Sequence, residues 1–404
     1  MQQRIAGIRQ GLLLVAIAWL APIGSTLFAP VLPHMIDHFS AVPHAALLAP
    51  VALVTPALLV ALLAPVAGLL ADRFGRRRLL MVALALYAVA GVLPYWIDNL
   101  YVIILTRMVV GVAEAGVMTV STALICDYFT GDRRAHWLSV QFGSASLVAI
   151  FCFALAGFLG SFDWRAPFLV YGGTALFIPL ALAVLFEPAR AAEPEQRAAV
   201  ETVRLLSARV VGCLALTLIC GALFYVTPVH ISLVLSERGI SDPQILGLAS
   251  AIGAMGAVAG AALFRLLSRR AIGALLTGAM ALQAAGYGLL YTQPSLSGTV
   301  IGMFVNNIGC GISLPLVLAL TMSKLPDAYR GRASGIWTSM FFIGQFSCPL
   351  MIGVASAAAG GMVATMGVLA SITGVAALLL LATSIFGRSL RQPVTTGAAP
   401  IPMH

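Results

Sequence analysis

The sequence predicts an all-α integral membrane protein with twelve transmembrane helices. Of its 404 residues, 60% are hydrophobic and 9% are charged, whereas soluble domains carry about 25% charged residues. Apolar runs recur between residues 11 and 386, and twelve helices of about 20 residues would use roughly 240 of them. The runs lack the alternating pattern of outer-membrane strands. These observations exclude a water-soluble enzyme, a disordered chain and a soluble head on a single anchor.

The individual helices follow from apolar runs separated by short polar loops. The first run is too long for the hydrophobic part of a cleavable signal and lacks a small-residue cleavage site, so we expect it to be a retained first span. Helices satisfy every backbone polar group within the bilayer, which favours them for each run. The expected spans are residues 11–36, 45–70, 79–97, 100–126, 137–160, 166–186, 210–235, 244–267, 271–291, 297–322, 334–357 and 362–386.

The longest polar segment, residues 187–209, contains four glutamates and four arginines between spans six and seven. It divides the chain into an N-terminal six-helix bundle, residues 1–186, and a C-terminal six-helix bundle, residues 210–404, that ends in a short polar tail. We expect residues 187–209 to be a cytoplasmic central loop, part of which could form an amphipathic surface helix.

The two halves resemble an internal repeat. The loops that follow spans two and eight share four matched pairs at an offset of 192 residues: Gly68 with Gly260, Arg73 with Arg265, Arg77 with Arg269, and Arg78 with Arg270. Two repeated bundles with the same in–out sense predict pseudo-symmetric halves that rock around a site at the middle of the membrane.

The basic residues predict the orientation. If the N-terminus is cytoplasmic, that side receives 20 of the 23 Lys and Arg residues, the outer loops receive Arg165 and Arg238, and Arg107 lies within span four. This asymmetry predicts that both termini lie on the cytoplasmic side of a cell (inner) membrane. It also assigns the net charge of +9 to orientation and lipid contact, so we expect no nucleic-acid partner.

Six scattered cysteines, with no C-x-x-C pair, fall in or beside apolar runs. They are typical of small buried hydrophobic residues. We therefore expect no metal site and no cofactor.

The loop after span two reads Gly68-x-x-x-Asp72-Arg73-x-Gly75-Arg76-Arg77. Gly68 would let span two approach a neighbour closely, Gly75 would permit a tight turn, and the arginines could pair with Asp72 or with Asp127 at the end of span four. The motif resembles the loop 2–3 signature of the major facilitator superfamily. The resemblance implies a monomeric transporter in which Gly68, Asp72, Arg73, Gly75, Arg76, Arg77 and Asp127 form a latch that holds the cytoplasmic ends together. The alternative is a basic loop that only signals orientation.

Glu114 is the one acidic residue near the middle of a span, and Arg107 precedes it by two helical turns, about 10.5 Å along the axis. We interpret Glu114 as the proton carrier and Arg107 as its modulator, with side chains leaning together on one face. The alternative is a static buried ion pair. Residues 107–116 resemble the fourth-span motif of proton-linked members, and their Glu-Ala-Gly form is similar to that of Spinster-like transporters.

Substrate contacts are expected on the spans that face the cavity in this fold. A mixed aromatic and amide lining suits an amphipathic or aromatic compound. His230 could instead be bonded within its own helix, and Asn306 and Asn307 cannot both face the cavity. The candidates are Gln141, Phe224, Tyr225, His230, Asn306, Asn307, Phe341 and Gln345.

The function predicted from the sequence is proton-coupled efflux of small amphipathic or aromatic compounds by alternating access. One alternative is a proton-coupled uptake symporter for an organic anion or metabolite, which Arg107 would bind. A distant alternative is a membrane-embedded lipid-modifying enzyme, for which the sequence supplies no convergent nucleophile and base. We expect a small-molecule substrate, protons and membrane lipids as the partners of a non-enzymatic transporter.

Overall fold

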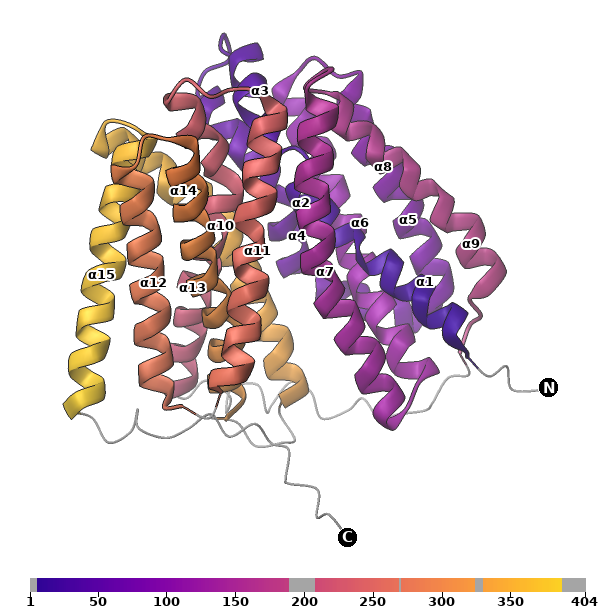
Figure 1. Ribbon diagram of the computed structural model, residues 1–404. Coiled ribbons are helices and arrows are strands. Elements are labelled where there is room, and N and C mark those ends of the chain that lie inside the picture. The colour runs from indigo at the N-terminus through magenta and orange to yellow at the C-terminus, as the bar shows by residue number, and fades with distance from the viewer. Residues whose placement is uncertain (1–5, 189–207, 269, 324–329, 387–404) are drawn as a thin grey trace.

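The computed structural model describes residues 6–188, 208–268, 270–323 and 330–386. The regular elements in these ranges are helices (Figure 1). Twelve helical stretches among them are long and apolar enough to cross a membrane. This confirms the predicted all-α, twelve-span architecture, and the spans begin and end within six residues of the expected positions.

The first half contains spans one to six (Figure 1). Spans one, three and six are each built from more than one helical segment, whereas spans two, four and five are single helices. Their elements are α1 (Ile8–Ala18), α2 (Leu20–Thr26), η1 (Ala29–Val31), α3 (Leu32–His38), α4 (Ala45–Phe74), α5 (Arg76–Val92), η2 (Leu93–Tyr95), α6 (Leu100–Tyr128), α7 (Gly131–Gly160), η3 (Ala166–Phe168), α8 (Leu169–Gly173), η4 (Thr174–Leu176) and α9 (Phe177–Val184).

The second half contains spans seven to twelve, each a single helix. Prolines lie inside three of these helices without ending them. The elements are α10 (Ala208–Glu237), α11 (Pro243–Leu267), α12 (Ile272–Thr292), α13 (Leu296–Ser323), α14 (Arg330–Ala359) and α15 (Met362–Phe386).

Span one departs from the single helix that the sequence predicted. It is interrupted at Trp19 and again at residues 27–28. Pro22 and Pro30 lie just beyond these interruptions, and a proline removes the hydrogen bond to the carbonyl four residues earlier and crowds that carbonyl. At the break, some backbone carbonyls near the middle of the span have no hydrogen-bond partner within the helix. Side chains of other helices can then donate to them.

Each half packs mainly on itself, and two helix pairs make the most extensive contacts between the halves, with smaller contacts of η1 and α3 against the second half. Within the halves, α6 packs against α4 and α5, and α13 packs against α11 and α12. Between them, α7 packs against α11, and α4 packs against α14. Figure 1 shows the first half in indigo to magenta beside the second half in red to yellow. The α7–α11 and α4–α14 contacts are therefore the two main seams between the halves.

The seam between α7 and α11 is closest near one face of the molecule. In Figure 1, α1 begins and α15 ends at what we call the lower face, and α7 ends at the opposite, upper face. A Cβ on Gly157 would lie 2.8 Å from the Gly247 Cα, and a Cβ on Gly247 would lie 2.6 Å from the Gly157 Cα. Because no larger residue fits there, backbone meets backbone between the halves toward the upper face.

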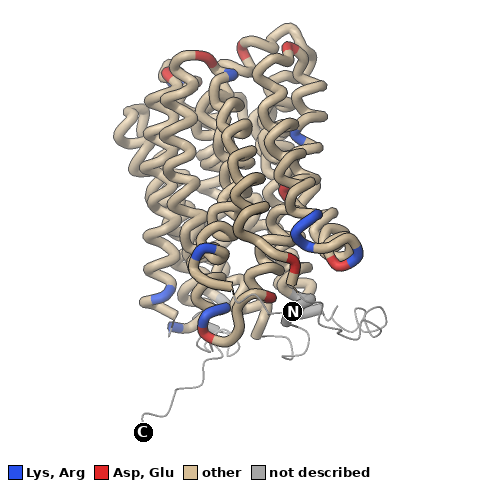
Figure 2. Tube along the Cα trace, turned by 90° about the vertical axis from the view of Figure 1, so that its right-hand side faces the viewer, with Lys and Arg blue, Asp and Glu red and all other residues tan. Residues whose placement is uncertain are grey.

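The charged residues are unequally shared between the two faces (Figure 2). Blue segments in Figure 2 gather toward the lower face, where α4 leads into α5 and α6 leads into α7. Arg165 and Arg238 lie in the loops that follow α7 and α10 at the upper face. Lys324, Arg269 and most of the central loop, including its expected amphipathic helix, lie outside the described residues. The proposed limits of the two bundles at 186 and 210 stay a prediction.

Candidate functional site

A cavity of about 240 Å³ lies between the two halves. Its walls come from α2, α4, α6 and α7 on one side and from α10, α11, α13 and α14 on the other. Most lining side chains are apolar, which is usual for a small-molecule site. Its aromatic residues and one methionine are Phe153, Phe224, Tyr225, Met303, Phe341 and Phe342.

Helix α6 supplies the single charged side chain among the described residues that line this cavity, Glu114. The helix begins after Asn99, whose Oδ1 accepts hydrogen bonds from the backbone N–H groups of Tyr101 and Val102. The Glu114 side chain is 3% exposed, and its Oε2 has no hydrogen-bond partner within the described part of the chain. Burying an ionised carboxylate without a partner is costly, so this oxygen requires a proton or a donor.

Glu114 lies directly against the backbone of the broken first span. A Cβ on Gly24 would lie 2.6 Å from Glu114 Oε2 and 3.4 Å from the Tyr87 hydroxyl. Atoms do not approach that closely, so only glycine leaves room for the carboxylate. This contact places the acid between span one and the cavity.

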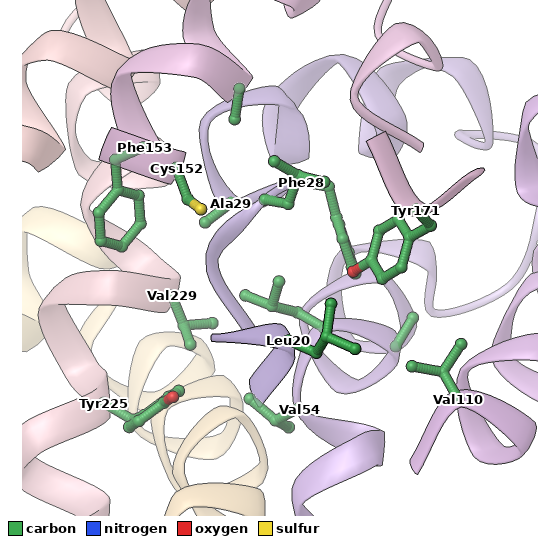
Figure 3. Packing of buried hydrophobic residues seen from close by; sticks show 14 of the residues in the cluster. Leu20, Phe28, Ala29, Val54, Val110, Cys152, Phe153, Tyr171, Tyr225 and Val229 are labelled. Atoms are coloured by element: carbon green, nitrogen blue, oxygen red, sulfur yellow. The ribbon is translucent and has the colours of Figure 1, made fainter. Parts of the chain in front are cut away.

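Arg107 is fully buried and is held by aromatic rings and a carbonyl. Its Nη2 donates to the Gly24 carbonyl at 2.5 Å. Its guanidinium carbon lies 5.0 Å from the ring centres of both Phe28 and Tyr171, and Figure 3 shows these two residues within a cluster of buried hydrophobic residues. Such contacts stabilise a buried cation through the negative faces of the rings.

The structure separates the two side chains that we expected to lean together. Among the described residues, no salt bridge within 4.0 Å joins Arg107 to Glu114. Glu114 lines the cavity and Arg107 does not. The reason is that Arg107 finds its partners in Phe28, Tyr171 and the Gly24 carbonyl. The static ion pair considered above is therefore absent from this conformation.

The break in span one explains why these groups gather there. The carbonyls in the last turn of a helix have no partner within the helix. At the end of α2, the Gly24 carbonyl accepts from Arg107 and from the Tyr171 hydroxyl, the latter at 3.2 Å. The Tyr87 hydroxyl donates to the Leu20 carbonyl at 2.6 Å. Gly24, Phe28, Tyr87 and Tyr171 were not predicted as site residues from the sequence, although the prolines of span one signalled the break.

Five of the eight candidate substrate residues line the cavity: Phe224, Tyr225, Asn307, Phe341 and Gln345. The Asn307 Nδ2 donates to the Gly253 carbonyl at 3.0 Å, and its Oδ1 accepts from the Thr227 hydroxyl at 3.1 Å. The Gln345 side chain is 1% exposed, and its Oε1 has no partner among the described residues. Gln345 is thus the freer of the two amides to bind a ligand.

The other three candidates do not line this cavity. The Gln141 Nε2 donates to the Thr122 hydroxyl at 3.0 Å. Within α10, the His230 Nδ1 lies 3.3 Å from the Val226 carbonyl, which is the helix-bonded alternative considered above. The Asn306 Nδ2 donates to the Gln283 carbonyl at 3.4 Å, between α13 and α12. Neighbouring helices therefore take up the Gln141 and Asn306 side chains, and the His230 ring is bonded to its own helix.

The residues of the expected latch lie together at the lower end of the first half. Gly75 turns the chain between α4 and α5 with φ +96°. Arg76 forms ion pairs with Asp127 and, at 3.5 Å, with Asp72. The Arg73 guanidinium lies over the Phe74 ring. The partners found in the described residues belong to the first half, so a gating role for the group stays a prediction.

Two details of this group differ from the expectation. A Cβ on Gly68 would lie 3.8 Å from Thr119 Cγ2, an ordinary contact, so this conformation does not require glycine there. The sequence analysis also missed Glu187, whose two carboxylate oxygens accept from the backbone N–H groups of Arg76 and Arg77 at 2.6 and 2.9 Å. An acid at the start of a helix is favoured by the helix dipole, and here it ties the end of span six to α5.

The described residues contain no group of three or more His, Cys, Asp or Glu side chains that could hold a metal ion. The chemistry available at the cavity is therefore that of one carboxyl group, two amides, hydroxyls and aromatic rings.

Comparison with known proteins places the chain in a family. The sequence model described as Major Facilitator Superfamily matches residues 14–349. The tetracycline resistance protein, class E, of Escherichia coli is 24% identical over 85% of this chain and 87% of its own length. The bacillibactin exporter of Bacillus subtilis is 25% identical over 80% of this chain and 83% of its own length. A shorter match, 32% identical over 32% of this chain and 26% of the relative, is to protein spinster homolog 1 of Xenopus laevis.

Solved structures agree on the fold. A bacterial homolog of the human lysosomal transporter Spinster, in an inward-facing and unoccupied conformation, superposes with a TM-score of 0.74, 17% identity and coverage of 97% of this chain and 98% of that one. A nucleoside transporter superposes with a TM-score of 0.73, 14% identity and coverage of 93% and 99%.

Proposed function

Because this chain belongs to the Major Facilitator Superfamily, we propose that it is a proton-coupled exporter of small amphipathic or aromatic compounds. The family and its solved relatives are transporters, so the chain is a transporter and not an enzyme. In the proposed cycle the two halves rock about the central cavity, which opens to one face at a time. The protein acts as a monomer in contact with membrane lipids, and protons and the small-molecule substrate are its other partners.

The observation that carries this proposal is the position of Glu114. It is the charged lining residue of a cavity between two halves, and its Oε2 has no partner in the described residues. A carboxyl group so placed takes up a proton when the cavity faces the more acidic side. It gives the proton up when the cavity opens to the other side and a substrate or water approaches. Arg107, held behind Gly24, modulates the exchange through its charge.

The apolar and aromatic side chains that line the cavity suit an amphipathic or aromatic compound. The names of relatives support export over uptake. Two relatives that match most of the chain are named as a resistance protein and an exporter.

The alternative, uptake of an organic anion, requires Arg107 to contact the substrate. Arg107 is fully buried, is enclosed by Phe28 and Tyr171, and does not line the cavity. The lining residues in the described part of the chain therefore offer an anion no positive side chain, which supports export over this alternative.

We further propose that the lower face is cytoplasmic in the cell (inner) membrane. The arginines of the α4–α5 and α6–α7 connections lie there, as the preference of cytoplasmic loops for basic residues requires. On this orientation, the Asp72–Arg76–Asp127 group lies on the cytoplasmic side, where it would latch the halves when the cavity opens outward.

Purified protein in liposomes, with an internal pH-sensitive dye and a panel of aromatic compounds, tests the function. We expect substrate movement to drive proton movement in the opposite direction. The variant Glu114→Gln should abolish transport driven by a pH gradient, whereas Asp98→Asn, which removes an acid from the upper surface, should retain it. Wild-type coupling in Glu114→Gln would exclude Glu114 from the mechanism, and proton and substrate movement in the same direction would establish a symporter.

A further inference from the structure

A hydrogen bond crosses from one half of the protein to the other on the lower side of the central cavity. The Ser339 hydroxyl of α14 donates to the Ala61 carbonyl of α4 at 3.0 Å. We propose that this bond is a releasable tie, which opposes separation of α4 from α14 below the cavity. The tie acts on the balance between conformations and not on the substrate or the coupled ion, so it goes beyond the proposed export function.

The acceptor of this bond is available because α4 contains a proline. Pro65 lies within α4 and does not end it. A proline has no N–H to donate to the carbonyl four residues earlier, and here that carbonyl belongs to Ala61. A helix in a membrane has to satisfy such a carbonyl with a donor from elsewhere. Ser339 supplies this donor from the other half of the protein, 278 residues away.

The donor behaves differently from its neighbour in α14. The Thr338 hydroxyl donates to the Ser334 carbonyl of its own helix at 2.9 Å, as hydroxyls within helices commonly do. Ser339 instead bonds across the seam. When α4 and α14 separate, the Ser339 hydroxyl can turn to a carbonyl of its own helix, whereas the Ala61 carbonyl has no N–H donor at position 65. The unpaired acceptor therefore favours the closed seam.

The bond lies about one helical turn below the cavity. Ala57 of α4 and Phe342 of α14 line the cavity. Ala61 is four residues farther toward the lower end of α4, and Ser339 is three residues nearer to the lower end of α14, which is about 4.5–6 Å at 1.5 Å per residue. The glycine contact between α7 and α11 closes the other seam toward the upper face. The cavity thus lies between a glycine contact above it and a hydrogen bond below it.

The strength of one hydrogen bond suits a tie that has to be released. Separation of the halves at this level exchanges the bond for contact with water. Such an exchange favours the intact bond by a ratio of about 2- to 12-fold between two states. A bias of this size holds most molecules with the seam closed and still lets the seam open in each transport cycle.

Spin labels on Val66→Cys and Gly335→Cys measure this seam, in a background in which the six cysteines are replaced by alanine. Both positions are exposed and lie about one turn below the bonded residues of α4 and α14. In Ser339→Ala we expect the ratio of long to short distances to rise about 2- to 12-fold. Thr338→Ala removes the neighbouring hydroxyl, which bonds within α14, and should leave the ratio unchanged.

A double-mutant cycle tests the role of the proline. In Pro65→Ala, residue 65 gains an N–H that can donate to the Ala61 carbonyl within α4. We therefore expect the ratio of long to short distances to rise as it does in Ser339→Ala. The two substitutions together should add little to either one alone, because both remove the same interaction.

An unchanged distance distribution in Ser339→Ala, or an equal shift in Thr338→Ala, would overturn the tie. So would a shift toward shorter distances, or additive effects of Ser339→Ala and Pro65→Ala. The distances are measured without a substrate and without a pH gradient. Failure of the tie therefore leaves the proposed export standing, whereas a protein that shows the tie but moves no compound against protons would overturn the export alone.

Discussion

Gly24 is the residue at which the two buried charged side chains of span four, Arg107 and Glu114, meet span one. Its carbonyl accepts a hydrogen bond from Arg107, and its Cα leaves the space that Glu114 occupies. The Arg107 guanidinium on one side contacts the Gly24 carbonyl and two rings. Glu114 Oε2 on the other side has no hydrogen-bond partner among the described residues. The functional asymmetry between Arg107 and Glu114 therefore depends on a residue without a side chain.

Gly24→Ala tests this role. The added Cβ would lie 2.6 Å from Glu114 Oε2, so we expect the carboxylate to be displaced and the protein to lose about 1–3 kcal/mol of stability, as overpacked sites do. We also expect pH-driven transport to fall. Thermal unfolding in detergent and transport in liposomes measure the two effects.

The matched control is Gly212→Ala in α10, where a Cβ would meet no atom within 4 Å. Equal behaviour of the two alanine variants would show that the contact between Gly24 and Glu114 is not required.

At the scale of elements, a polar cluster ties three segments of the upper face together. Asp98, which precedes α6, contacts His38 at the end of α3 at 2.5 Å and Arg165, which precedes η3, at 2.7 Å. The hydrogen bond to His38, helped by the Arg165 charge, lowers the pKa of the Asp98 carboxyl below its usual value. The cluster lies wholly in the first half, so it stabilises that bundle rather than the contact between halves.

The lowered pKa predicts how this cluster responds to pH. A carboxyl whose pKa is lower in the folded state contributes its full stability above its unfolded value, near pH 4, and loses it as the pH falls through the folded value. We expect Asp98→Asn to lower the melting temperature at pH 7 and to match the wild type well below pH 4. Intrinsic tryptophan fluorescence during heating in detergent measures this. Asp37→Asn, at a neighbouring exposed acid, serves as the control, and a difference that persists at low pH would contradict the assignment.

The crossing of α7 and α11 is the second feature at this scale. Gly157 and Gly247 let the backbones of the two halves touch toward the upper face. No charged group is needed to close this seam, because close packing of small residues suffices in a membrane. Any side chain placed there has to separate the halves.

Gly157→Leu should therefore shift the protein toward the conformation that is open at the upper face. Overpacking costs about 1–3 kcal/mol, which changes a two-state ratio by about 5- to 150-fold. Distances between spin labels on residues 162 and 244, at the upper ends of the two helices, should lengthen in the variant. Gly173→Leu, at a position where a Cβ meets nothing within 4 Å, should leave them unchanged. Unaltered distances in Gly157→Leu would mean that this seam does not open.

At the scale of the whole molecule, the arginines and the cavity distinguish the lower face from the upper face and so define a direction across the membrane. The lower face carries the arginines of the α4–α5 and α6–α7 connections, and the cavity lies between halves that touch toward the upper face. An exporter needs such a direction, because the proton gradient and the substrate must be handled from opposite sides.

The orientation can be measured with single cysteines. We expect Ser297→Cys, at the start of α13 on the upper face, to react with a membrane-impermeant maleimide in intact cells. Asp132→Cys, near the start of α7 on the lower face, should react only after permeabilisation. This follows from the excess of arginine on the cytoplasmic side. The reverse labelling pattern would invert the molecule and, with it, the direction of the proposed proton flow.

The sequence by itself determined the twelve helices, the two halves and the position of the buried charges along the chain. These follow from local physics, since an apolar run of sufficient length must form a helix in lipid whatever surrounds it. The sequence also singled out Glu114 as a candidate functional residue, because an acid in the middle of an apolar span is costly wherever the helix lies.

Only the tertiary structure decided which way each side chain faces and what it meets. It placed Asn307 at the cavity and Asn306 against α12, and it gave Arg107 a partner in Gly24 that lies 83 residues away. Helix rotation and contacts between distant segments depend on the packing of all twelve spans together. A linear pattern of hydropathy does not contain that information.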